Sequence, residues 1–343
     1  MKHMRITVIA LIAIALLLIT AGCTQPAGTT SKTTVAPTTS VAPIKELRIG
    51  YQPSTHQMAH TTAMDKGWWQ QDLGPLGVQN VSDKVFPTGA PEMQAMLAGD
   101  LDVAYVGAAP VLSAISTGLD AKIVGGVNTQ GSDLVLKSGL NFTSPQSLKG
   151  LTIATFQAGT IQDTVLRNWL ARNNVSVGTG VTDVKILGMG PGDAVTAIIA
   201  GKVDAVFLPA PSPSVIEGQG KGKIVVHSGE MYPQHTCCVL VVSGKLIREH
   251  PEIVSQILKT NEKAVAFNLK NSDEAAAIYA TKTGAKVEDV KASLKEWDGD
   301  WSTDPNPIVA SVLDYAKIQY DLGYIKTPLT KDQLFDLTFY KKN

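Results

Sequence analysis

Short apolar runs alternate with stretches of helical spacing from residue 46 onward. A first strand is predicted at 46–52, followed by a helix to about Trp69, and a second strand at 81–86 precedes a helix that begins near Pro91. The same alternation continues through the middle of the chain. Further strands are predicted at 102–106, 121–127, 133–137, 150–156, 181–187, 203–208, 224–226 and 237–242, with helices at 110–117, 160–172 and 193–200.

From residue 245 onward the pattern predicts helices only. Strands that alternate with helices are typical of parallel sheets, so we predict an α/β fold whose late helices pack on sheets formed earlier. The late helices are predicted at 245–250, 251–269, 273–283, 287–297, 305–322 and 331–334.

One sequence pattern occurs twice in the chain. Residues 96–110 read MLAGDLDVAYVGAAP, and residues 198–211 read IIAGKVDAVFLPAP. Each copy contains a helix end, an aspartate, a strand and a turn of small residues, and Asp102 matches Asp204. The repeat predicts two similar lobes, each directing a helix N-terminus toward something between them.

The N-terminal segment predicts export. Residues 1–22 have a basic start and an apolar run too short for a comfortable transmembrane helix, which is typical of a signal peptide. Cys23 follows Ala-Gly as in a lipobox, although Thr20 replaces the usual leucine; the alternative is an ordinary cleaved signal peptide. We expect Cys23 to carry a lipid that anchors the chain to the outer face of the cell membrane, with residues 23–45, rich in Thr and Pro, as a flexible tether.

Charge and cysteine content limit the partners. Lys plus Arg equals Asp plus Glu, 30 each, without a basic block, so nucleic acid is not expected. Cys237 and Cys238 are adjacent, and since a vicinal disulfide is strained we expect two buried thiols on a strand. Without CxxC spacing, and with no third ligand beside His56 and His60, we expect no metal and no cofactor.

Four quoted segments carry a resemblance to a known family: RIGYQP from Arg48, FPTGAPEMQAMLAGDLDVAYVGAAP from Phe86, KIVGGVNTQGSDLVLK from Lys122 and KGLTIATFQAGTIQDTVL from Lys149. The sequence resembles the periplasmic solute-binding proteins of ABC importers for nitrate, sulfonate, taurine and related solutes. The resemblance covers nearly all of 46–343 and implies a two-lobe, hinged fold of the type II periplasmic-binding class with a ligand cleft between the lobes.

The resemblance also implies the domain boundaries and partners. Lobe 1 would be 46–138 with 237–343, lobe 2 would be 139–236, and the hinge crossings would lie near 137–141 and 232–237. A monomer would deliver a small solute to an ABC permease and its ATPase. The solute would be a small anion such as an aliphatic sulfonate or taurine.

Several turns are predicted to place helix N-termini at the cleft, where free N–H groups and the helix dipole favour an anion. The alternative is that they are ordinary strand-to-helix turns, in which Gly and Pro are common. We expect the Gly107 turn to bind the polar head and the 209–211 turn to shape the wall or the lobe contact. The expected ligand-binding residues are Gln52, Ser54, Thr55, His56, Gly89, Ala90, Gly107, Ala108, Ala109, Asn128, Phe156, Gly159, Thr160, Gly190 and Asp193, and Gln162 is a further candidate donor.

Other functions stay open at this point. No nucleophile elbow or pair of catalytic carboxylates is present, so we expect no enzyme activity. The alternatives are an exported enzyme on the same fold, pyrimidine-synthase-like or metal-dependent, and a receptor for nitrate, bicarbonate or a heterocycle.

Overall fold

The computed structural model describes residues 43–340. The predicted signal peptide, Cys23 and all but the end of the predicted tether lie outside this range. Within the described range, no helix has both the length and the apolar character needed to cross a bilayer.

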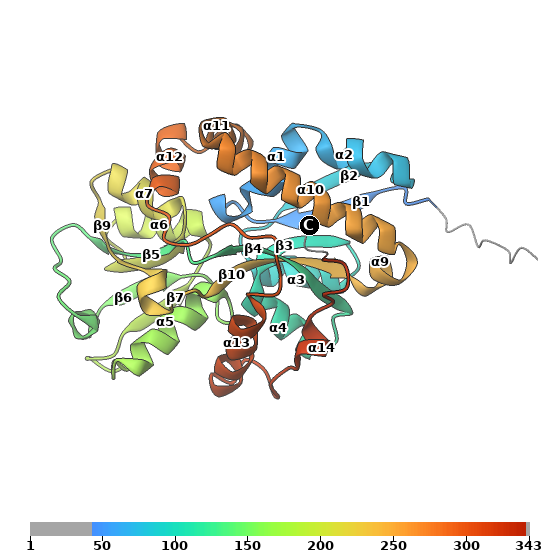
Figure 1. The fold of residues 1–343 in the computed structure, drawn as a ribbon. Helices are drawn as coiled ribbons and strands as arrows, with labels where there is room; N and C mark the ends of the chain where they lie inside the picture. The colour runs from blue at the N-terminus through green and yellow to red at the C-terminus, as the bar shows by residue number, and fades with distance from the viewer. Residues whose placement is uncertain (1–42, 341–343) are drawn as a thin grey trace, which may run out of the picture. The chain divides into compact units, whose positions relative to one another are not determined.

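Five strands form a first sheet in the order β2-β1-β3-β10-β4 (Figure 1). β1 is parallel to β2 and β3, whereas β10 is antiparallel to both of its neighbours. The strands are β1 (Leu47–Tyr51), β2 (Val81–Val85), β3 (Val103–Gly107), β4 (Ala121–Thr129) and β10 (Thr236–Ser243).

A second sheet has the order β7-β6-β8-β5-β9. β6 is parallel to β7 and β8, and β5 is antiparallel to β8 and β9. In each sheet the strand that runs against the others is therefore the one that enters from the other sheet, and the prediction of purely parallel sheets is wrong for β5 and β10. The strands are β5 (Ser132–Lys137), β6 (Thr152–Thr155), β7 (Lys185–Gly188), β8 (Ala205–Pro209) and β9 (Gly222–His227).

Two links join the sheets, and we call the parts built on the first and second sheets the first and second halves. The chain passes to the second sheet at Gln130–Gly131, not near 137–141 as expected, because β5 is hydrogen-bonded to β8 and β9. It returns through Tyr232–His235, inside the expected range. The links lie side by side, since the Gln130 amide donates to the His235 carbonyl over 3.0 Å.

The repeated aspartates have the same structural role in each half. Asp102 accepts hydrogen bonds from the Arg48 amide, at 3.0 Å, and from the Arg48 guanidinium. Asp204 accepts from the Thr152 amide, also at 3.0 Å, and from the Lys137 ammonium. Each carboxylate thus fixes the start of the first parallel strand of its own half.

Helices flank both sheets (Figure 1). The first half contains η1 (Thr55–Gln57), α1 (Met58–Asp65), α2 (Trp68–Leu73), η2 (Gly74–Leu76), α3 (Gly89–Leu97) and α4 (Ala108–Ser116). The second half contains η3 (Pro145–Leu148), α5 (Ile161–Arg172), α6 (Pro191–Ile199), α7 (Ser212–Gly218) and α8 (Ser228–Met231). The late helices are α9 (Gly244–Glu249), α10 (Pro251–Lys270), α11 (Ser272–Thr283), α12 (Val287–Lys295), α13 (Val309–Asp321) and α14 (Lys331–Leu334).

The late helices pack on both halves, as predicted. α10 lies against α1 and α2, α13 contacts α4 and α5, and α12 contacts α7. Between α12 and α13, an extended segment is hydrogen-bonded along β4, and Asp298 in it accepts from the amides of Gly131 (2.8 Å) and Gly229 (2.7 Å). The C-terminal third of the chain therefore braces the region of the links.

Candidate functional site

A small buried cavity lies where the two sheets meet. Four lining residues mark the carboxyl ends of four strands: Gln52 follows β1, Gly107 ends β3, Phe156 follows β6 and Pro209 ends β8. Its free volume is about 10 Å³, close to what one water molecule needs. The other lining residues are Ser54, His56, Gln57, Ile161, Gln162, Cys237 and Cys238.

The two halves touch around this cavity. The Ala210 carbonyl accepts from the Thr55 amide (3.1 Å) and from the Ser54 hydroxyl (3.0 Å). On the other side Gly107 faces α5 so closely that a Cβ on it would lie 3.1 Å from Ile161 Cγ1. The Pro209–Pro211 turn therefore forms part of the contact between the halves, as expected.

The predicted helix N-termini form where expected. Gly107 is the N-cap of α4, and Thr160 is the N-cap of α5, where its side chain accepts from the Asp163 amide. α3 and α6 begin at Gly89 and Pro191. Among these helices, α4 and α5 border the cavity, through Gly107 and Ile161.

A polar network lies beneath the cavity on the first half. The Gln52 amide donates to Gln57 Oε1, and Gln52 Nε2 donates to Glu92 Oε2, both over 2.6 Å. Glu92 is fully buried, and burial raises its pKa well above the usual range. Burial therefore favours the neutral form of this carboxyl group over the carboxylate.

Two thiols and an imidazole form a cluster in the cavity wall. His56 Nδ1 lies 3.1 Å from Cys237 Sγ and 3.8 Å from Cys238 Sγ, and the sulfurs are 3.8 Å apart. The hydrogen bond with Cys237, together with that to His56, lowers the pKa of Cys238, while burial raises the pKa of Cys237 well above its usual value. Both cysteines are free and buried, as predicted from their adjacency.

His60 lies apart from this cluster although it shares a helical face with His56 in the sequence. Its Nε2 lies 3.2 Å from Asp83, and its ring packs against Tyr51 and Tyr105. Burial lowers the pKa of His60. It is a core histidine and does not line the cavity.

The sequence profile of the NMT1-like family matches residues 40–282. The chain belongs to the NMT1-like family. It is 27% identical over 303 residues to a putative aliphatic sulfonates-binding protein of Bacillus subtilis, covering 87% of this chain and 88% of the relative.

Solved structures share the two-lobe fold of this NMT1-like chain. The alkanesulfonate-binding protein SsuA of Xanthomonas axonopodis pv. citri, bound to MOPS, superposes with a TM-score of 0.74 at 21% identity over 86% of this chain and 99% of that one. The nitrate-binding protein NrtA of Synechocystis PCC 6803 superposes with a TM-score of 0.72 at 16% identity over 85% of each chain.

Five of the residues expected to bind ligand line the cavity of the NMT1-like chain: Gln52, Ser54, His56, Gly107 and Phe156. Others lie nearby for different reasons. Ala90 and Gly159 line a separate space of about 140 Å³ between α3, α4 and the turn before α5. The remaining expected residues, none of which lines the cavity, are Thr55, Gly89, Ala108, Ala109, Asn128, Thr160, Gly190 and Asp193.

The structure gives several of these residues other contacts. The Asn128 amide donates back to the Thr129 and Gln130 carbonyls, and Asp193 is exposed on α6. A Cβ on Gly190 would lie 3.8 Å from Pro87, so this turn approaches the first half outside the cavity.

Sequence reasoning missed four of the lining residues: Gln57, Ile161, Cys237 and Cys238. Pro209, at the repeat position that matches Gly107, also lines the cavity, where the 209–211 turn was expected to shape the wall or the lobe contact. The adjacency of the two cysteines predicts buried thiols but does not predict their place in the cavity wall. Gln162, a further candidate donor, does line the cavity, and its Nε2 lies 3.1 Å from Ser132 Oγ.

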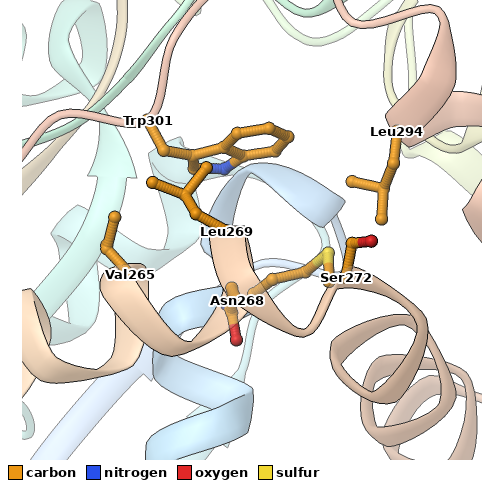
Figure 2. Close-up of a pocket in the computed structure, with 7 residues that line it drawn as sticks. Val265, Asn268, Leu269, Ser272, Leu294 and Trp301 are labelled. Carbon is orange, nitrogen blue, oxygen red and sulfur yellow. The ribbon is translucent and has the colours of Figure 1, made fainter.

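An apolar cavity of about 110 Å³ lies elsewhere in the NMT1-like chain (Figure 2). Leu269, Leu294 and Trp301 point into it. The Trp301 ring stacks on Trp297 at 4.1 Å, and Trp297 meets the His56 ring edge-on at 4.7 Å. The tryptophan pair therefore stands between this cavity and the thiol cluster.

Proposed function

We propose that this chain is the solute-binding component of an ABC import system and that it holds a small anionic solute of the aliphatic sulfonate class between its halves. The observation that carries the proposal is the cavity at the carboxyl ends of β1, β3, β6 and β8. In open α/β sheets ligands bind outside the carboxyl ends of the strands. Here those ends belong to two sheets and converge on one space.

Neutral donors are the means of holding an anion in this site. No lysine or arginine is among the residues that line the cavity. The N-terminal ends of α4 and α5 border it, and their free amides and dipoles favour negative charge. The amides of Gln57 and Gln162 add side-chain donors, and the burial of Glu92 disfavours an opposing carboxylate charge.

A sulfonate is larger than the present space, so the halves have to separate to admit it and close on it with a wider gap. Hinged closure of this kind turns on a few residues in the connecting segments. Gln130 and Gly131 of the first link have positive φ angles of 55° and 80°, and the second link is short. Contacts between the halves include the hydrogen bond from the Ser54 hydroxyl to the Ala210 carbonyl and the close approach of Gly107 to Ile161.

The names of the relatives support the same class of solute and a binding role without catalysis. The Bacillus relative is named for aliphatic sulfonates, and the Xanthomonas structure holds MOPS, itself a sulfonate. With the N-terminal segment, the proposal extends to a monomer exported by residues 1–22, anchored by a lipid on Cys23 and presenting its solute to a permease and its ATPase.

The test is a thermal-unfolding screen of the full chain with alkanesulfonates, taurine, nitrate and carboxylates of matched size. A specific sulfonate should stabilise the chain saturably, by about 2.7 kcal/mol at a hundredfold excess over Kd. Gln162→Glu places a carboxylate in the cavity and should raise the Kd for the sulfonate at least tenfold. The stabilisation at a fixed sulfonate concentration should fall accordingly. Gln71→Glu, the same change at an exposed site on α2, should leave it unaltered.

The proposal fails if no sulfonate stabilises the parent chain, or if Gln162→Glu binds as well as Gln71→Glu. Saturable stabilisation by nitrate alone would replace the sulfonate class with the one named for the Synechocystis neighbour.

A further inference from the structure

The two cysteines lie together because β10 is irregular at this point. Neighbouring residues of a strand ordinarily point to opposite faces of the sheet. In the pairing of β10 with β4, Thr236 is opposite Thr129 and Cys238 is opposite Asn128, so Cys237 is an extra residue. A bulge of this kind re-aims a side chain and is common beside functional sites. Here it brings both sulfur atoms to one wall of the cavity, 3.8 Å apart.

The imidazole of His56 has a fixed orientation toward both sulfurs. Its Nε2 lies 2.6 Å from the Gly131 carbonyl oxygen, which can only accept, so Nε2 carries the proton in the neutral ring. The lone pair is then on Nδ1, the atom that faces Cys237 and Cys238. Histidines that bind metals are oriented in this way by a carbonyl or carboxylate on the other ring nitrogen. The edge of Trp297 packs against the ring and holds its plane.

The spacing of the three atoms fits one tetrahedral ion. Bonds of about 2.3 Å to sulfur hold two sulfurs about 3.8 Å apart, and a bond of about 2.0–2.1 Å to nitrogen places each sulfur about 3.5–3.6 Å from it. The two sulfurs are 3.8 Å apart, and the distances from Nδ1 to them are 3.1 and 3.8 Å. A ring shift of a few tenths of an ångström would make the two nitrogen distances equal.

The donor set and its charge select the class of ion. Two thiolates and an imidazole are soft ligands, which exclude Mg²⁺ and Ca²⁺ because those ions prefer oxygen. Two thiolates neutralise a divalent ion, and no lysine or arginine lines the cavity to balance the excess negative charge that a monovalent ion would leave. The three residues are at most 4% exposed, so this balance has to be made by the ion itself.

We propose that His56, Cys237 and Cys238 form a binding site for a thiophilic divalent metal ion, of which Zn²⁺ is the probe, with its fourth coordination position directed into the cavity. Binding exchanges the thiol protons for two metal–sulfur bonds, and the displaced protons pass to solvent. The open position accepts water or a donor atom of the solute, as in other sites that have three protein ligands. The site goes beyond the proposed function, since its three ligands belong to the first half and need no solute.

The test titrates Zn²⁺ into the full chain, reduced and stripped with a chelator, in competition with a chromogenic chelator. One ion per chain is expected. Replacing both cysteines (Cys237→Ser with Cys238→Ser) should abolish this binding, and His56→Gln should weaken it. The matched controls are Cys23→Ser, which removes the remaining cysteine of the chain, and His227→Gln, which removes an imidazole outside the cavity; both should bind like the parent.

Cobalt provides a readout that does not depend on the folding of a variant. Co²⁺ added to the parent chain should give a thiolate-to-cobalt charge-transfer band and the intense visible bands of tetrahedral cobalt. The inference is overturned if the parent chain binds no stoichiometric Zn²⁺, if the cobalt complex lacks the charge-transfer band, or if Cys23→Ser abolishes binding. Sulfonate stabilisation measured on the metal-stripped chain separates this result from the proposed function, because either can be found without the other.

Discussion

The crossovers β3–α4 and β8–α7 arise from the same repeated sequence but end differently. Up to the strand they are alike, since Asp102 and Asp204 each bind the backbone of the neighbouring strand. The two crossovers differ at the turn after the strand. Gly107 leads directly into α4, whereas Pro209 is followed by Ala210 and Pro211 before α7 begins.

The first turn exposes donors and the second exposes an acceptor. α4 begins with free amides beside the cavity, whereas the Ala210 carbonyl is used to bind Ser54 and Thr55 of the opposite half. The same arrangement of strand and aspartate is therefore followed by two different turns, one that borders the cavity with amide donors and one that contacts the opposite half. The thiol cluster adds to this asymmetry, because all its side chains come from the first half.

The largest expected effect follows from filling the Gly107 position. Gly107→Val should force the halves apart, because even a Cβ would lie 3.1 Å from Ile161 Cγ1, while the Gly107 φ of −58° suits any residue. We expect a cost to the closed state of about 2–3 kcal/mol, or roughly 30- to 150-fold in sulfonate affinity. Sulfonate titration and small-angle scattering check this. Gly192→Ala on α6, where a Cβ meets open space, is the control.

Substitutions of Asp102 and Asp204 test whether the two aspartates stabilise their halves equally. Asp102→Ala removes a two-point contact with the Arg48 guanidinium as well as an amide bond, and should lower the free energy of unfolding by about 2–3 kcal/mol. Asp204→Ala removes one ammonium contact and one amide bond, and should cost about 1–2 kcal/mol. Urea unfolding measures both, and a reversed order would contradict the comparison.

The link between the halves should make stability depend on pH. His235 is fully buried, and burial lowers its pKa to about 4, below about 6.5 for a free histidine. As pH falls from 6.5 to 4 the unfolded chain gains this proton first, so the free energy of unfolding should drop by about 3 kcal/mol on this account. Urea unfolding of His235→Gln between pH 6.5 and 4 should show that the free energy of unfolding depends less steeply on pH than in the parent chain. The difference in slope should correspond to about one proton.

His227 is the control for this experiment, with the opposite sign. Its hydrogen bond with Asp133 raises its pKa to about 9, so its contribution is present below 6.5 and lost as pH rises through 9. His227→Gln removes a contribution of the opposite sign, so the loss of stability that His235 causes between pH 6.5 and 4 should persist in this variant. An acid limb that is the same in His235→Gln and the parent would disprove the assignment to His235.

The smallest expected effect concerns the contact made by the second turn. Ser54→Ala removes the hydroxyl bond to the Ala210 carbonyl and the cap that this hydroxyl gives the His56 amide, but leaves the bond from the Thr55 amide. The closed state should lose about 1 kcal/mol, near fivefold in sulfonate affinity, without a change in the urea midpoint of the solute-free chain beyond a few tenths of a molar. An effect as large as that of Gly107→Val would mean that the second turn dominates closure.

Features governed by neighbouring residues could be predicted from the sequence. The four helix starts were found because Gly and Pro mark strand-to-helix turns locally, and the repeat fixed the equivalence of Asp102 and Asp204. α7 was missed because Pro211 and Pro213 resemble a continuing turn, although proline is well tolerated in the first turn of a helix.

Features governed by pairing partners could not be predicted. The apolar residues of β5 indicate that the strand is buried but not in which sheet, so the first link was placed too late. The bulge that gathers Cys237 and Cys238 arises from the register of β10 against β4, more than a hundred residues earlier in the chain. The sequence therefore indicated the cavity's helix ends but not the cluster in its wall.

The position of β10 between β3 and β4 also has a consequence for synthesis. All five strands of the second sheet lie within Ser132–His227, so they are complete when the chain has grown that far. The first sheet lacks β10 until Thr236–Ser243 has been made. Because β10 lies between β3 and β4 and is hydrogen-bonded to both, nothing joins these two strands before then. Although it begins the chain, the first half is thus the last to be completed as the protein is made.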